Sequence, residues 1–179
     1  AREGARTSPQ KQKENDVKTS RHLAMTALLG SLFLAASVHA QTYSSIGGTG
    51  TVLSGSFSYN AAGNTITIAG SSSSTRILYN VPNPKDTGSP AWTTLEILAT
   101  DGGSFSTVSA ALIRVPRTTG SPESTLCTAT STTGVTPAVY TCTFSSSLID
   151  FANYYYYVRV SLTRNSLSEF PAINALRVF

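Results

Sequence analysis

The sequence predicts an all-β protein, an antiparallel β-sandwich of the jelly-roll type with about eight or nine strands. Three observations support this. Apolar residues are not sustained at helical spacing after residue 40, Gly, Pro, Ser and Thr interrupt every stretch, and short runs rich in β-branched and aromatic residues recur at regular intervals. The expected strands lie near 51–59, 64–69, 75–81, 91–100, 106–115, 124–130, 138–145, 154–164 and 173–179.

Turn residues separate several of these strands. Residues 60–64 predict a hairpin turn in which a Gly or Asn takes a positive φ, and residues 101–103 predict a second tight turn. Residues 82–90 contain three prolines, which cannot donate to a sheet ladder, so they predict a longer exposed loop. Residues 47–50 are Gly-rich, and because no helix is expected after them we interpret them as a flexible lead-in.

The clearest strand is 154–164, because its side chains divide cleanly between two faces. One face is apolar and is predicted to pack in the core: Tyr154, Tyr156, Val158, Val160 and Leu162. The other face is amphipathic and is predicted to meet solvent: Tyr155, Tyr157, Arg159, Ser161 and Thr163. This pattern is typical of an antiparallel sheet with one solvated side.

Cys127 and Cys142 are the only cysteines, and they predict a structural disulfide. A hairpin that pairs them would have its tip between Gly134 and Val135, inside the turn-like segment 131–136. The two cues together predict a hairpin with a cross-strand bridge. The spacing is far from that of a CxxC redox or metal motif.

Residues 17–40 predict a helical, cleaved secretory signal peptide. Basic residues precede an apolar stretch at 23–38, and a small-x-small site then predicts Gln41 as the mature N-terminus. The apolar stretch is interrupted by polar residues and is shorter than the ~20 apolar residues of a spanning helix, so we expect no stable membrane span after cleavage. Residues 41–179 are therefore expected to form a single secreted or periplasmic domain.

Residues 1–16 are polar and mixed in charge, and we interpret them as a non-coding or disordered extension, with a bacterial start at Val17. The net charge of +4 is uneven, because residues 1–40 contain six bases and three acids, whereas the remainder contains seven bases and six acids. A nearly neutral domain has no electrostatic footprint for a phosphate backbone, so we expect no nucleic-acid partner.

The only histidines, His22 and His39, lie in the predicted leader. A mature domain without histidine excludes Ser-His-Asp and Cys-His catalysis and the usual zinc sites, so we expect no enzyme activity. Six carboxylates remain, but no motif pairs them for glycoside hydrolysis. A structural calcium site would use oxygen ligands from Asp86, Asp101 or Asp150. Because the sequence has no Asp-x-Asp spacing to support such a site, we expect no cofactor.

Two places are candidates for ligand binding. Tyr155, Tyr157 and Arg159 offer flat rings and a hydrogen-bonding fork on the solvated face of strand 154–164, which suits sugar rings or peptide planes. Cross-strand packing is the simpler explanation of the same residues. Trp92, the only tryptophan, follows the Pro-rich loop. Its side chain could form a platform for a ligand, and packing in the core is the simpler explanation.

These features favour an exported binding or adhesion module without catalytic activity, whose partner is a carbohydrate, an envelope component or a cell-surface protein. One alternative is a structural subunit of a surface fibre or coat, although residues 175–179 lack the penultimate tyrosine and upstream glycine usual in chaperone-assembled pilins. A further alternative is a small outer-membrane β-barrel, although neither face of 106–115 is apolar from end to end.

Overall fold

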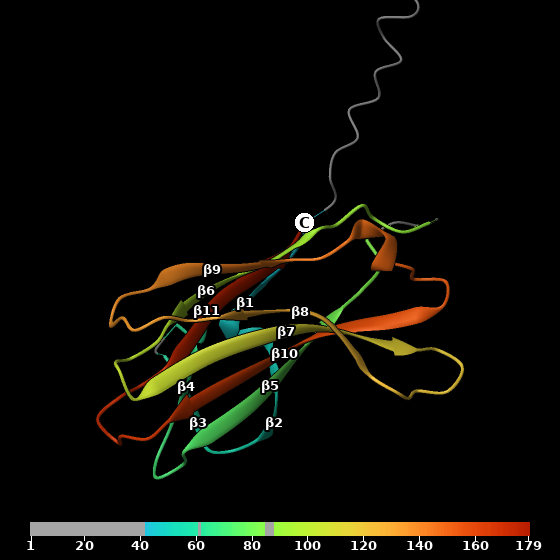
Figure 1. Ribbon diagram of the computed structural model, residues 1–179. Coiled ribbons are helices and arrows are strands. Elements are labelled where there is room, and N and C mark those ends of the chain that lie inside the picture. Colours follow the sequence, from blue (N-terminus) through green and yellow to red (C-terminus); the bar gives the residue numbers. More distant parts are fainter. Residues whose placement is uncertain (1–41, 61, 85–87) are drawn as a thin grey trace, which may run out of the picture. The chain divides into compact units, whose positions relative to one another are not determined.

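The fold is built from short β-strands that pair into two antiparallel sheets (Figure 1). The computed structural model describes residues 42–60, 62–84 and 88–179. Within them the strands are β1 (Tyr43–Ile46), β2 (Thr51–Ser54), β3 (Phe57–Tyr59), β4 (Ile66–Ile68), β5 (Ser74–Val81), β6 (Thr94–Thr100), β7 (Ser106–Pro116), β8 (Ser124–Thr130), β9 (Ala138–Thr143), β10 (Tyr154–Arg164) and β11 (Ala172–Val178). Two 3₁₀ turns accompany them, η1 (Gly47–Thr49) and η2 (Ser146–Leu148).

The strand order confirms the predicted sandwich. The first sheet runs β3-β4-β11-β6-β9, with β1 also paired to β11, and the second sheet runs β2-β5-β10-β7-β8. Figure 1 shows the layer of β6, β9 and β11 facing the layer of β5, β7 and β10. Most connections carry the chain from one sheet to the other, which is the jelly-roll manner of winding.

The structure has more strands than the sequence predicts. The single strand expected at 51–59 is two strands, β2 in the second sheet and β3 in the first, because the chain turns at Gly55. Gly55 has a φ of 88°, and a Cβ on it would lie 2.1 Å from the carbonyl oxygen of Ser74. Only glycine fits such a close approach at positive φ. β1 was not predicted, because this four-residue strand has no clear apolar alternation in its sequence.

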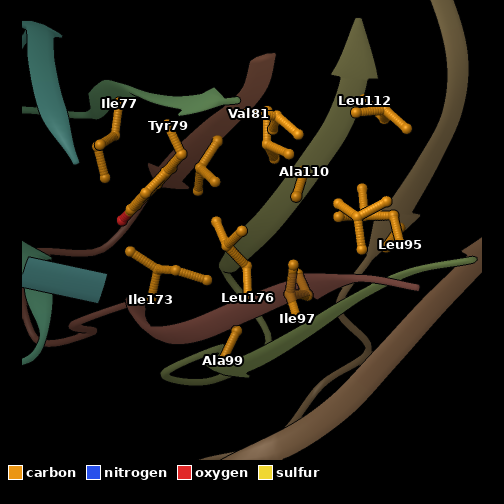
Figure 2. Packing of buried hydrophobic residues seen from close by; sticks show 14 of the residues in the cluster. Ile77, Tyr79, Val81, Leu95, Ile97, Ala99, Ala110, Leu112, Ile173 and Leu176 are labelled. Carbon is orange, nitrogen blue, oxygen red and sulfur yellow. The ribbon is translucent and has the colours of Figure 1, made fainter. Parts of the chain in front are cut away.

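The core lies between the sheets, and β10 supplies its clearest stripe. Tyr156, Val158, Val160 and Leu162 are buried, whereas the residues between them are partly exposed, so the predicted division of faces is confirmed for this part of the strand. Tyr154, also predicted to pack in the core, is only partly buried against it. Figure 2 shows side chains of the first sheet, such as Ile97 and Leu176, meeting side chains of the second. Burying one such aliphatic side chain contributes about 1.5–3 kcal/mol before entropic costs.

The Gly-rich segment at 47–50 is packed, and its interpretation as a flexible lead-in is wrong. Gly47, the first residue of η1, and Gly50, which directly follows η1, are both buried. A Cβ on Gly47 would lie 2.0 Å from the carbonyl oxygen of Ile173, and the Tyr79 hydroxyl donates to the carbonyl oxygen of Gly47. Glycine is needed at these positions because neighbouring backbone and side-chain atoms occupy the space that a Cβ atom would fill.

The predicted disulfide is present, but the predicted hairpin is not. Cys127 lies on β8, which pairs with β7, and Cys142 lies on β9, which pairs with β6. The two strands are therefore consecutive edge strands of different sheets, and the bridge connects the sheets, with 5.8 Å between its Cα atoms. The spacing alone could not distinguish this arrangement from a hairpin, because both need the same reversal of the chain.

The predicted extension at 1–16, the signal peptide at 17–40 and the mature start at Gln41 lie outside the described residues. In the part of the chain that the structure does describe, no helix has the length and apolar character required to cross a bilayer. The hairpin predicted at 60–64 connects β3 and β4, which pair antiparallel, and Gly63 has a φ of 70°.

Candidate functional site

The outer face of β10 carries three of the predicted binding residues. Tyr155, Tyr157 and Arg159 alternate with buried neighbours, so they form a row along the solvent side of the second sheet. Because β10 lies between β5 and β7, both adjacent strands flank the row. Asn80 of β5 is opposite Tyr157, and Val115 of β7 is opposite Tyr155.

Tyr155 stands at the edge of a hollow of about 300 Å³, called here the Tyr155 hollow. Tyr155 is 57% exposed, and the guanidinium carbon of Arg117 lies 4.8 Å from the centroid of its ring. The polar side chains of Asn80 and Asn83 also line the hollow. A partly exposed ring beside amide and guanidinium donors can hold a flat apolar surface and hydrogen-bond its polar rim.

The site residues Tyr157 and Arg159 meet a carboxylate that the sequence analysis did not connect with them. The Tyr157 hydroxyl donates to one oxygen of Glu123, and Nη1 of Arg159 donates to the other at 3.2 Å. Glu123 lies in the loop between β7 and β8, so it fixes this loop over the outer face of β10. These contacts hold both side chains in place next to the Tyr155 hollow.

Burial raises the pKa of Tyr157 to about 12, and its hydrogen bond to Glu123 adds to the increase. An unperturbed tyrosine ionises near pH 10. The pKa of Tyr157 is higher in the folded protein than in the unfolded chain. Its stabilising contribution is therefore complete below about pH 10 and is lost as the pH rises from about 10 to 12.

We therefore expect Tyr157 to remain protonated at about pH 11, where a solvated tyrosine is mostly ionised. Removing the carboxylate in Glu123→Gln should lower the pKa of Tyr157, though not fully to 10, because burial is the larger cause. The ¹³Cζ resonance of Tyr157, assigned through Tyr157→Phe, reports the titration. An unchanged pKa in Glu123→Gln would contradict the contact.

The structure places Trp92 in the core. Its side chain is 2% exposed, and its ring meets that of Phe151 edge-on with 5.9 Å between centroids. A ligand therefore cannot reach the ring of Trp92 in this conformation. We leave Trp92 out of the candidate site, and the simpler explanation that the sequence analysis gave for it fits its position.

Every described carboxylate has a hydrogen-bond donor within the fold. The acids and their donors are Glu96 with Arg177, Asp101 with Ser106 and Ser131, Glu123 with Tyr157 and Arg159, Asp150 with Asn153 and the amide of Ala152, and Glu169 with the amide of Phe105. Asp86 lies outside the described residues. Among the residues that the structure describes, no group of three or more acids, cysteines or histidines is placed to hold a metal ion.

A second hollow, of about 400 Å³, lies on the outer face of the first sheet. Its lining includes apolar side chains such as Leu98 and Val139, and also the ion pair between Arg177 and Glu96, with 2.7 Å between Nε and Oε1. None of the described residues that line it is aromatic, so these residues offer no ring on which a planar ligand could stack. The Tyr155 hollow is therefore the stronger candidate.

Sequence reasoning missed Arg117 and Glu123, which complete the site. Both belong to the β7–β8 loop, more than thirty positions before their partners on β10. The one available signal was their charge, because charged residues make up only 12% of this chain and two of them stand in one short loop. Nothing in the local pattern indicates which strand the loop covers.

No protein-family model matches the chain, and no curated protein is detectably similar to it in sequence. Similar solved structures include the carbohydrate-binding module CBM36 in complex with calcium and xylotriose, at 14% identity and a TM-score of 0.46, with 75% of this chain and 97% of that chain covered. Another is the CBM36-1 domain of a multidomain xylanase from the hindgut metagenome of Trinervitermes trinervoides, at 13% identity and a TM-score of 0.47, with 78% and 97% covered. A third is a family two carbohydrate esterase from Cellvibrio japonicus, at 11% identity and a TM-score of 0.42, with 77% of this chain and 33% of that chain covered. Likenesses of this strength assign neither a family nor a function to the chain.

Proposed function

We propose that the domain is a non-catalytic module that binds a carbohydrate at the Tyr155 hollow. The observation that carries the proposal is that Tyr155 is 57% exposed on a strand at the middle of its sheet. A rigid strand positions the ring without ordering cost, and ring faces accept the apolar C–H faces of sugars. Asn80 and Arg117 line the same hollow with groups that can hydrogen-bond sugar hydroxyls, whereas Nδ2 of Asn83 donates to the carbonyl oxygen of Gly88 at 3.1 Å.

The geometry favours a flat, polar-edged ligand over a large protein surface. The hollow is small, and its lining combines aromatic rings with amides and a guanidinium. Tyr157 and Arg159 follow Tyr155 on the same face of β10 and are held there by Glu123, although none of the three lines the hollow. A preformed site of this kind needs little rearrangement to bind one or a few sugar units.

Replacing Tyr155 by alanine is expected to weaken binding to a polysaccharide by about tenfold or more, because the stacking surface is lost. The midpoint of thermal unfolding should change little, since the ring is exposed. Binding is measured by affinity electrophoresis and calorimetry on a panel of plant, algal and bacterial polysaccharides.

The matched control is Tyr59→Ala, because Tyr59 is 48% exposed and lies on β3 of the first sheet. It should leave the affinity unchanged. Equal affinities for the wild type and Tyr155→Ala would overturn the site. Failure of the wild type to bind any saccharide would overturn the proposed function.

We also propose that the domain works outside the cytoplasm. The disulfide between Cys127 and Cys142 supports this, because such bonds form and persist in oxidising compartments. Fractionation of expressing cells with intact-mass measurement tests it. A species that begins at Gln41 and contains the oxidised bridge is expected outside the cytoplasm, and a reduced, full-length cytoplasmic species would contradict the proposal.

A further inference from the structure

The charge of the Tyr155 hollow restricts the kind of sugar it can hold. Among the residues that the structure describes, Arg117 is the one charged residue that lines it, and no acid of that part of the chain does. Tyr154, another lining residue, has the guanidinium carbon of Arg114 at 4.7 Å from its ring centroid. Two guanidinium groups therefore lie at or beside a hollow in a domain that is otherwise nearly neutral.

Two of the described carboxylates, Glu123 and Asp150, are hydrogen-bonded to groups outside the lining of the hollow. Glu123 accepts hydrogen bonds from Tyr157 and from Arg159, which neutralises it. Asp150 accepts from the amide of Ala152 at 3.0 Å and from Nδ2 of Asn153 at 2.7 Å, so its oxygens are directed to its own turn.

Arg117 is held in a position to meet a ligand. Its backbone N–H donates to the carbonyl oxygen of Asn153 at 2.9 Å, and its Nη1 donates to the carbonyl oxygen of Phe151 at 3.0 Å. A guanidinium has five N–H donors, and within the described residues this one bond engages its head. The Tyr155 ring supports the same head from one side. The remaining donors form a fixed fork, which matches the oxygens of an anionic group.

We propose that the Tyr155 hollow binds an acidic sugar, with the ring of the sugar against Tyr155 and its anionic group on the guanidinium of Arg117. This rests on the proposed carbohydrate-binding function and narrows its ligand class. The shared chemistry is an anionic pyranose, and the charge comes either from the carboxylate of a uronic acid or from a sulfate ester. Both present oxygens that a guanidinium fork can engage.

The test compares polysaccharides that differ in charge alone. The carboxylate arm uses polygalacturonate against its highly methyl-esterified form, and the sulfate arm uses dextran sulfate against dextran. The full-length protein is expected to bind the charged member of one pair at least about tenfold more tightly, and the pair that shows this identifies the source of the charge. Raising the salt from about 20 to about 200 mM should weaken that binding.

Arg117→Gln should lower the affinity for the charged polymer about tenfold and lower the affinity for its neutral partner by a clearly smaller factor, because the glutamine amide still donates hydrogen bonds to hydroxyls. Arg117→Lys should give an intermediate affinity, because it keeps the charge and loses the planar fork. The matched control is Arg76→Gln, an exposed arginine further along β5, which removes the same charge outside the hollow. Circular dichroism confirms that each variant is folded.

Two results overturn the inference and leave carbohydrate binding standing: neutral and charged polymers bound equally well, or Arg76→Gln weakening binding as much as Arg117→Gln. If both variants weaken binding equally, the arginines act through the overall positive charge of the surface, and Arg117 has no specific contact with the ligand. Binding to no polymer, charged or neutral, would instead overturn the proposed function together with this inference.

Discussion

Replacing Trp92 by alanine is expected to lower the free energy of unfolding by about 3–5 kcal/mol, the largest effect that we predict for a single side chain. Trp92 is among the largest side chains that the fold buries fully. Its ring meets Phe151 edge-on, and Phe151 in turn packs on Tyr156 with 4.7 Å between ring centroids. The alanine variant loses the buried area of the indole and leaves a cavity among rings that cannot collapse to fill it.

Such a loss is a large part of the stability of a small domain, which is typically about 5–15 kcal/mol. Urea unfolding followed by far-ultraviolet circular dichroism measures it, since the variant has no tryptophan fluorescence. Trp92→Phe is the matched control and should cost about 1–2 kcal/mol, because it keeps an aromatic ring in the cavity. A Trp92→Phe variant that is as stable as the wild type but binds its polysaccharide tenfold less tightly would reverse our assignment of Trp92 to the core.

The elements that could be predicted are those whose pattern is local. The alternation in β10 places Tyr155 and Tyr157 on the outer face and Tyr156 in the core, because the two faces of a strand follow directly from a period of two. The hairpin turn at 60–64 follows in the same way from its turn residues. Local chemistry of this kind is readable in a single sequence.

Sheet membership was not readable, because it depends on which strands meet after the chain has crossed the sandwich. The segments around Cys127 and Cys142 have the spacing of a hairpin, yet they lie in different sheets. The segment 51–59 has the length of one strand, yet the turn at Gly55 divides it between the sheets. In both cases the deciding contacts are made with strands distant in sequence.

The same limit applies to the candidate site. The aromatic row on β10 was predicted, but Arg117 stacks on Tyr155 and Glu123 joins Tyr157 to Arg159 only because the β7–β8 loop folds back over β10. The side chains of Asn80 and Asn83 join them from β5 and the loop that follows it. A site assembled from three separate segments has no contiguous motif.

Removing the disulfide is expected to lower the free energy of unfolding by about 3 kcal/mol, the value that the chain-entropy model gives for a loop of this size. Cys127 and Cys142 are separated by 15 positions and connect the edge strands β8 and β9 of opposite sheets. In this model the effect arises in the unfolded chain, which gains freedom when the loop opens. The double variant Cys127→Ala/Cys142→Ala tests it by urea unfolding.

A comparison of the double variant with the reduced wild type separates the bridge from the packing of the two side chains, which are partly buried against the core. The reduced protein keeps both sulfur atoms, so any stability it loses belongs to the bond, and the further loss in the double variant belongs to packing. Equal stability of the oxidised and reduced proteins would mean that pairing of β8 with β7 and of β9 with β6 holds the two edges without the bridge. Polysaccharide affinity should be the same in both forms while they remain folded, because Tyr155 lies on β10, which is hydrogen-bonded on both sides within the second sheet. A bridge at the edge of the sandwich therefore stabilises the fold without setting the geometry of the Tyr155 hollow.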